Sequence, residues 1–62
     1  MSEKVDLKVN EMLKNFGGAK LALVGAELVY GERFRLRGRE YCEFVRFWTF
    51  VIVELKKRCN EF

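Results

Sequence analysis

An apolar stripe with helical spacing runs through residues 3–16. Its members recur three or four positions apart, as they do on one face of an α-helix: Val5, Val9, Met12, Leu13 and Phe16. Glu3 and Asp6 favour the N-terminal end of a helix dipole, and the pair Gly17-Gly18 is a typical helix stop. The pattern predicts an amphipathic helix over residues 3–16 whose stripe faces the core.

Residues 19–38 have a strand-like composition, interrupted by Gly25, Gly31 and Gly38. Polar and apolar side chains alternate cleanly only from Arg33 onward, which is the period of a β-strand. Gly38-Arg39 has the form of a two-residue type II′ turn between antiparallel strands. The segment therefore predicts extended structure that ends in a tight turn.

Residues 40–59 fit two interpretations. As a helix, the segment has one apolar stripe and no breaker for about twenty residues; the stripe consists of Tyr41, Phe44, Val45, Trp48, Val51, Ile52, Leu55 and Cys59. As a strand, it is rich in β-branched and aromatic side chains, which pack well on a pleated sheet. Both interpretations account for the pattern.

A pairing test favours the strand. A turn at Gly38-Arg39 sets Leu36 opposite Tyr41 and continues in register to Val24 opposite Val53, with all pairs on one face. One turn then explains two segments. We therefore predict an α+β fold, a single domain of residues 1–62 in which the N-terminal helix packs on a long antiparallel β-hairpin or short meander. A helical segment 40–59 is the alternative.

The second face of such a sheet would be apolar and uncovered, because one helix can cover only one face. Its residues would be Val29, Trp48, Phe50 and Ile52. Large uncovered apolar faces mark contact surfaces. We expect a homo-oligomer, most simply a homodimer, and a different protein partner is the alternative.

Positive charge is concentrated in the second half of the chain. Residues 1–32 carry net charge −1 and residues 33–62 carry +4, with all six arginines after residue 32. In an extended chain Arg33, Arg35 and Arg37 would line one face, a comb suited to phosphate oxygens. The expected nucleic-acid contacts, to RNA or DNA, are Arg33, Arg35, Arg37, Arg39, Lys57 and Arg58.

Catalytic and metal-binding patterns are missing from the sequence. There is no His, and the two cysteines, Cys42 and Cys59, form no metal-ligand motif, so neither a Ser-His type triad nor a zinc site is expected. We expect no cofactor and no metal, and the sequence favours a non-enzyme. Without a signal-peptide pattern or an apolar run that could span a membrane, we expect a cytoplasmic protein with reduced thiols and no membrane contact. The absence of Gln and Pro, with 34% charged residues, is typical of thermophilic proteins.

Residues 28–62 resemble the C-terminal half of RelE/ParE-type toxins. The resemblance rests on Phe34-Arg-Leu-Arg-Gly-Arg-Glu-Tyr41, an apolar segment 49–53, the pair Lys57-Arg58, and Glu61-Phe62. It implies strands in this half of the chain and a ribonuclease that works without His. It also implies that Arg35, Arg37 and Arg58 bind phosphate or stabilise its charge. Phe62 falls near the family's late Tyr and lacks the hydroxyl group.

The sequence thus leads to three hypotheses of function. The first is a small, basic, self-associating module that binds nucleic-acid phosphates through the arginine-rich strand. The second is a non-catalytic module for protein interaction or oligomerisation, in which the arginines only keep an edge soluble. The third, which follows from the resemblance alone, is a toxin-like ribonuclease or a degenerate relative of one.

Overall fold

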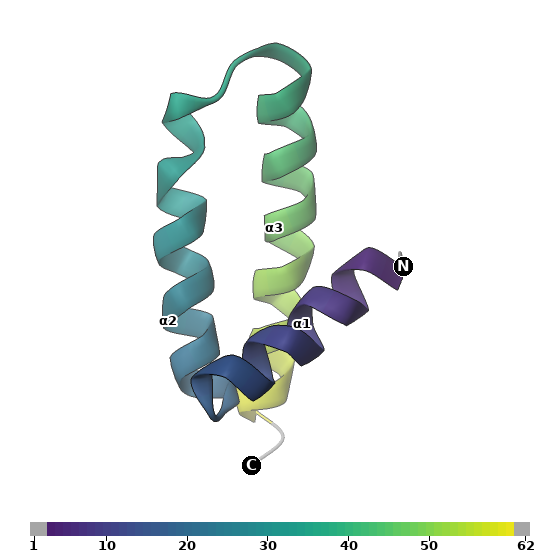
Figure 1. Ribbon diagram of the computed structural model, residues 1–62, viewed down its shortest axis with the longest axis vertical. Coiled ribbons are helices and arrows are strands. Elements are labelled where there is room, and N and C mark those ends of the chain that lie inside the picture. Colours follow the sequence, from purple (N-terminus) through teal and green to yellow (C-terminus); the bar gives the residue numbers. More distant parts are fainter. Residues whose placement is uncertain (1–2, 61–62) are drawn as a thin grey trace.

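The computed structural model describes residues 3–60, and this part of the chain is all-α. It consists of α1 (Glu3–Phe16), α2 (Ala19–Tyr30), the short 3-10 helix η1 (Gly31–Arg35) and α3 (Gly38–Asn60). In Figure 1, α2 and α3 lie side by side as a helical hairpin joined through η1 at one end. Helix α1 crosses the opposite end of this hairpin. Residues 3–60 contain no strand, so the predicted α+β fold is wrong, and the helical alternative for residues 40–59 is right.

Helix α1 confirms the prediction for residues 3–16. Val5, Val9 and Met12 are buried, as the stripe required. The helix ends at Phe16, and the next residue, Gly17, has a φ of 75° and donates its backbone N–H to the carbonyl oxygen of Leu13 at 3.0 Å. Because L-residues with a side chain rarely adopt this left-handed conformation, glycine is the residue suited to the reversal into α2.

Helix α2 packs closely against its neighbours through small residues. Ala22 and Ala26 are fully buried, and their spacing of four places them on one face of the helix. The ring of Phe16 lies directly on Gly25: a Cβ atom at that position would be only 2.6 Å from Cζ of Phe16. The missing side chain thus gives the end of α1 room to pack onto α2.

The core lies where the three helices meet. Leu55 and Val51 of α3 and Val9 of α1 are the largest fully buried side chains. Around the core pack half-buried apolar residues from all three helices; they are Leu13, Leu23, Phe47, Trp48 and Ile52. No charged or polar side chain is buried among residues 3–60. The core is therefore held by apolar packing and lies toward the end of the hairpin that α1 crosses.

Two segments expected to be extended are helical for a shared reason. A lone antiparallel pair satisfies half of its backbone groups from the partner strand, whereas a helix satisfies them locally and still buries one stripe. In α3 this stripe includes Val51 and Leu55, so burial outweighs the β-propensity of the individual residues. Gly38 does adopt a positive φ, 62°, but it begins α3 instead of forming a turn between strands. The predicted strand register therefore does not occur.

Candidate interaction surfaces

The arginine-rich segment lies at the closed end of the helical hairpin. Arg33, in η1, is held by its neighbours: the carbon of its guanidinium lies 4.7 Å from the centre of the Tyr30 ring and 4.3 Å from that of Phe34. Its Nη1 also donates a hydrogen bond to the carbonyl oxygen of Tyr30 at 3.3 Å. These contacts orient Arg33 back toward the end of α2. It is the arginine of this segment least available to a ligand.

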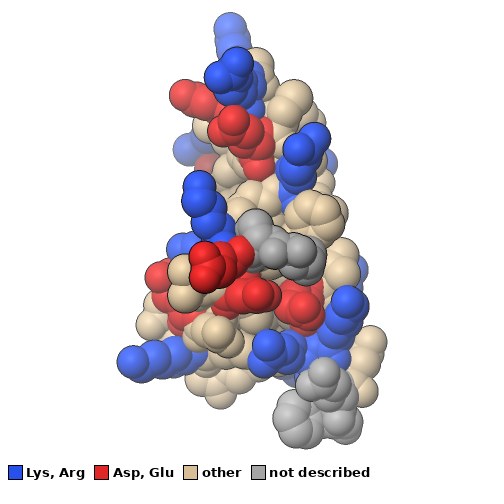
Figure 2. All heavy atoms as spheres, turned by 90° about the vertical axis from the view of Figure 1, so that its right-hand side faces the viewer, with Lys and Arg blue, Asp and Glu red and all other residues tan. Residues whose placement is uncertain are grey.

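The remaining arginines of the segment do not form a comb. Arg35 pairs with Glu32 at 3.2 Å, an exposed contact within η1. Arg37 and Arg39 are exposed and form no ion pair with any described residue. Since η1 has about three residues per turn, Arg33 and Arg35 point in different directions, and the alternation expected of a strand is lost. Figure 2 shows acidic side chains among the basic ones at the upper end of the visible face.

Lys57 and Arg58 lie far from the other predicted nucleic-acid contacts. They occupy the last turn of α3, whereas Arg39 is in its first turn. Arg39 and Lys57 are eighteen positions apart, which corresponds to about 27 Å of helix. Arg58 instead lines a depression at the open end of the hairpin with Gly18, Ala19, Lys20, Leu23 and Cys59. The structure thus separates the predicted basic site into two parts.

The predicted contact residues on the second sheet face are also dispersed. Trp48 and Ile52 are half-buried and pack against the core, and Trp48 contacts the rings of Phe44 and Phe47. Phe50 is 43% exposed, and its direction on α3 differs from that of Trp48 by about 200°. Val29, in the last turn of α2, is partly exposed. These four residues do not form one face.

A continuous apolar surface that the sequence interpretation missed lies on α2. Leu21, Val24 and Leu28 are 61%, 51% and 71% exposed, and their spacing of three and four places them on one side of the helix. We call these three residues the α2 stripe. Phe16, which packs on Gly25, adds an exposed ring edge beside it. The i, i+3, i+7 spacing was present in the sequence, but α2 is apolar on its buried side as well, and this concealed the pattern.

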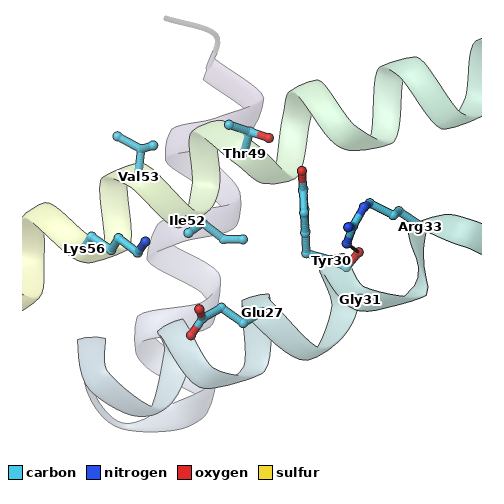
Figure 3. Close-up of a pocket in the computed structure, with 8 residues that line it drawn as sticks. All are labelled: Glu27, Tyr30, Gly31, Arg33, Thr49, Ile52, Val53 and Lys56. Atoms are coloured by element: carbon cyan, nitrogen blue, oxygen red, sulfur yellow. Dashed lines mark hydrogen bonds between the residues drawn. The ribbon is translucent and has the colours of Figure 1, made fainter.

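A shallow groove of about 390 Å³ runs between α2 and α3. Figure 3 shows it on the face of the hairpin that points away from α1, with Glu27 and Tyr30 on one wall and Thr49 and Lys56 on the other. Ile52 lies at its floor. The groove carries two cations, Arg33 and Lys56, and one carboxylate. Its lining is therefore both apolar and charged. Among the described side chains, no buried nitrogen or oxygen atom lacks a hydrogen-bond partner.

The described residues form no group of side chains suited to a metal ion. No three His, Cys, Asp or Glu side chains between residues 3 and 60 come together in a way that could hold a metal ion. Both cysteines are free; Cys42 is exposed and Cys59 half-buried. No helix in this part of the chain is both long and apolar enough to cross a membrane. The surfaces that stand out are those suited to contact with other molecules.

Comparisons with protein-family models, characterised proteins and solved structures found no match to this chain. The resemblance to RelE/ParE-type toxins implied strands within residues 28–62, yet the described part of that segment, residues 28–60, contains no strand. Phe62, the position set against the family's late Tyr, lies outside the described residues. The function must therefore be argued from the surfaces themselves.

Proposed function

We propose that this protein is a non-catalytic interaction module that binds another protein chain through the α2 stripe. The observation that carries this proposal is the exposure of three large apolar side chains in a row, Leu21, Val24 and Leu28, on a helix whose opposite side forms part of the core. Exposed apolar side chains scattered singly are ordinary on protein surfaces, whereas a contiguous group marks a contact surface. The cytoplasm remains the expected compartment.

The arrangement of the helices supports the same proposal. Helix α1 crosses the hairpin and packs against both α2 and α3, yet it leaves the α2 stripe exposed. Amphipathic helices commonly bind partners through side chains spaced i, i+3 and i+7, because such side chains form one ridge. Neighbouring α2 residues Ala22 and Ala26 are fixed in the core, so the stripe is presented on a well-packed helix. A preorganised contact face loses little conformational entropy on binding.

Photo-crosslinking tests this function. We expect a benzophenone amino acid at position 28 to form protein adducts in cells that produce the chain. The same amino acid at position 7 should give several-fold fewer. Leu7 is a matched control, because it is also a leucine in a helix and is 67% exposed, but it lies on α1 away from the stripe. Equal yields at the two positions, or no adducts from position 28, would exclude the α2 stripe as the contact face.

Phosphate binding by the closed end of the hairpin is a second candidate function. The observation in its favour is that Arg37 and Arg39 are exposed, form no ion pair within residues 3–60, and flank the N-terminal end of α3. Backbone N–H groups at a helix N-terminus attract anions, and arginine can bind phosphate oxygens bidentately. The ligand would be RNA or DNA, bound without sequence specificity.

A salt titration tests this second candidate. Replacing Arg37 and Arg39 with Gln should flatten the log–log dependence of single-stranded RNA affinity on salt by about 1.4, since each phosphate contact contributes roughly 0.7. Lys56→Gln with Lys57→Gln is the matched control: it removes the same charge from exposed positions at the other end of α3. Equal flattening by both pairs would indicate attraction by net charge alone and would contradict a site at the hairpin end.

A further inference from the structure

We infer that the partner of the α2 stripe is a second copy of this chain, with the two α2 helices antiparallel and Lys20 of each copy paired with Glu27 of the other. The inference rests on the proposed function, because it specifies the occupant of the same surface. Two observations support it: Lys20 and Glu27 lie along one edge of the stripe, and the midpoint between them falls close to Val24 at the centre of the stripe.

The apolar residues of the stripe are arranged nearly symmetrically about Val24, with Leu21 three residues before it and Leu28 four after it. In an antiparallel pair of α2 helices, a two-fold axis near Val24 brings Leu21 of one copy beside Leu28 of the other, and the reverse contact follows by symmetry. The two Val24 side chains meet at the axis. In this closed, self-complementary contact, each exposed leucine of one copy is covered by a leucine of the other.

The charged residues share nearly the same centre. Lys20 and Glu27 are exposed, lie on the same edge of the stripe, and form no ion pair with any described residue. The midpoint of Lys20 and Glu27 and the midpoint of Leu21 and Leu28 lie about 0.8 Å along the helix on opposite sides of Val24, so they are only about 1.5 Å apart. The axis that matches the leucines therefore also sets Lys20 opposite Glu27 of the second copy, twice. A parallel two-fold arrangement would place the edges that carry these charges on opposite sides of the helix pair, so neither Lys20 nor Glu27 would gain a partner.

Lys20 and Glu27 are placed unfavourably for the dipole of α2, which indicates that they interact with a group outside this helix. Lys20 lies in the first turn of α2 and Glu27 near its last turn, and the first turn has no acidic residue and the last turn no basic one. This is the unfavourable order for a helix dipole, which prefers acids at the N-terminus and bases at the C-terminus. An antiparallel second helix reverses the dipole beside each charge and supplies the missing partner.

The size of the surface sets the expected strength of the dimer. The exposed parts of the stripe and of Phe16 amount to roughly 400 Å² per copy, or on the order of 800 Å² for the pair, below the ~1,200 Å² of standard interfaces. The dimer should therefore be weak and concentration-dependent, with a dissociation constant of about 10 µM or above. A weak contact is the regime in which charge pairs and their reversal are easiest to measure.

Charge reversal, followed by sedimentation equilibrium under reducing conditions, tests the inference. The wild-type chain should dimerise as its concentration rises. Lys20→Glu and Glu27→Lys should each weaken the dimer by roughly tenfold, because each places like charges together twice. The double variant Lys20→Glu/Glu27→Lys should recover most of the wild-type affinity. Both substitutions suit the α2 dipole, so neither should cost helix stability, which far-UV circular dichroism checks.

Two further results would overturn the inference. Lys4→Glu lowers the net charge by two, as Lys20→Glu does, but on α1, so an equal weakening by this control and by Lys20→Glu would show that only net charge matters. A double variant no stronger than the single variants would reject the antiparallel register. A chain that stays monomeric throughout, while position 28 still forms adducts with other proteins, would reject the second copy but leave the proposed function standing. If the chain stays monomeric and position 28 forms no adducts, both the antiparallel dimer and the proposed function are rejected.

Discussion

Leu55→Ala should leave a large fraction of the molecules unfolded at 25 °C. Leu55 is fully buried on α3 at the junction of the three helices, where its side chain is part of the core that also contains Val9 and Val51. Truncation of a buried leucine costs about 2–5 kcal/mol, through lost apolar burial and the cavity left behind. A single core in a domain of this size rarely supplies more than roughly 3–5 kcal/mol. The loss is therefore comparable to the whole stability.

Urea unfolding followed by circular dichroism at 222 nm measures this effect. Leu7→Ala is the matched control, since it makes the same chemical change in a helix at a position that is 67% exposed. We expect Leu7→Ala to change the free energy of unfolding by less than about 0.5 kcal/mol. A loss at position 55 as small as at position 7 would mean that the three helices do not pack around Leu55.

Trp48→Ala should destabilise the folded chain by about 2–3 kcal/mol, less than a fully buried aromatic side chain because Trp48 is half-exposed. Its indole lies edge-on to the ring of Phe47, with ring centres 5.6 Å apart, and its centre is 6.1 Å from that of the Phe44 ring. It also packs on the core. Removing it should therefore lower the thermal unfolding midpoint even in dilute, monomeric protein.

Phe50→Ala is the comparison for Trp48→Ala. Phe50 is also aromatic and also on α3, but it is 43% exposed and lies outside the core cluster, so the expected loss is below about 1 kcal/mol. Thermal unfolding of both variants at two protein concentrations shows whether Trp48 stabilises the folded monomer or only its association. If Trp48→Ala left the midpoint of the dilute protein unchanged and only abolished association, Trp48 would be a contact residue, as the sequence had suggested.

The N-terminal helix could be predicted from the sequence because one signal dominated it. All apolar residues of α1 except the exposed Leu7 form a single stripe, and polar residues occupy most of the remaining surface. Glycine at position 17 marked the end of the helix correctly. Where one face is apolar and the other charged, the period alone decides between helix and strand.

Helix α3 was misassigned because two signals conflicted. The apolar stripe indicated a helix, whereas the β-branched and aromatic side chains between Tyr41 and Val53 favoured a strand. The strand was preferred because a turn at Gly38 gave a consistent pairing with the preceding segment. Local propensity is a weak guide when burial decides the outcome. The long stretch without a breaker was the better evidence, since twenty residues exceed the length of an ordinary strand.

The candidate contact surface could not be predicted because α2 is apolar on two sides. Ala22 and Ala26 face the core, while Leu21, Val24 and Leu28 face outward. With larger apolar residues on the outer side than on the inner one, hydrophobicity alone points to the wrong face. Only the close approach of Phe16 to Gly25 and the packing of the alanines show which side is covered. The arginine segment was visible in the sequence, but its supposed alternation depended on a strand that the fold does not contain.

Backbone amide chemical shifts in an NMR dilution series test most directly whether the α2 stripe is the face through which two copies of the chain bind each other. A chain of 62 residues gives a spectrum in which individual amides can be followed from about 20 µM to 1 mM. We expect concentration-dependent shifts or line broadening at residues 20–28, with little change in residues 33–39 or at Leu7. Shifts confined to the arginine segment or to α3 would contradict self-contact through the α2 stripe, and no shifts over the whole range would contradict a second copy as its partner.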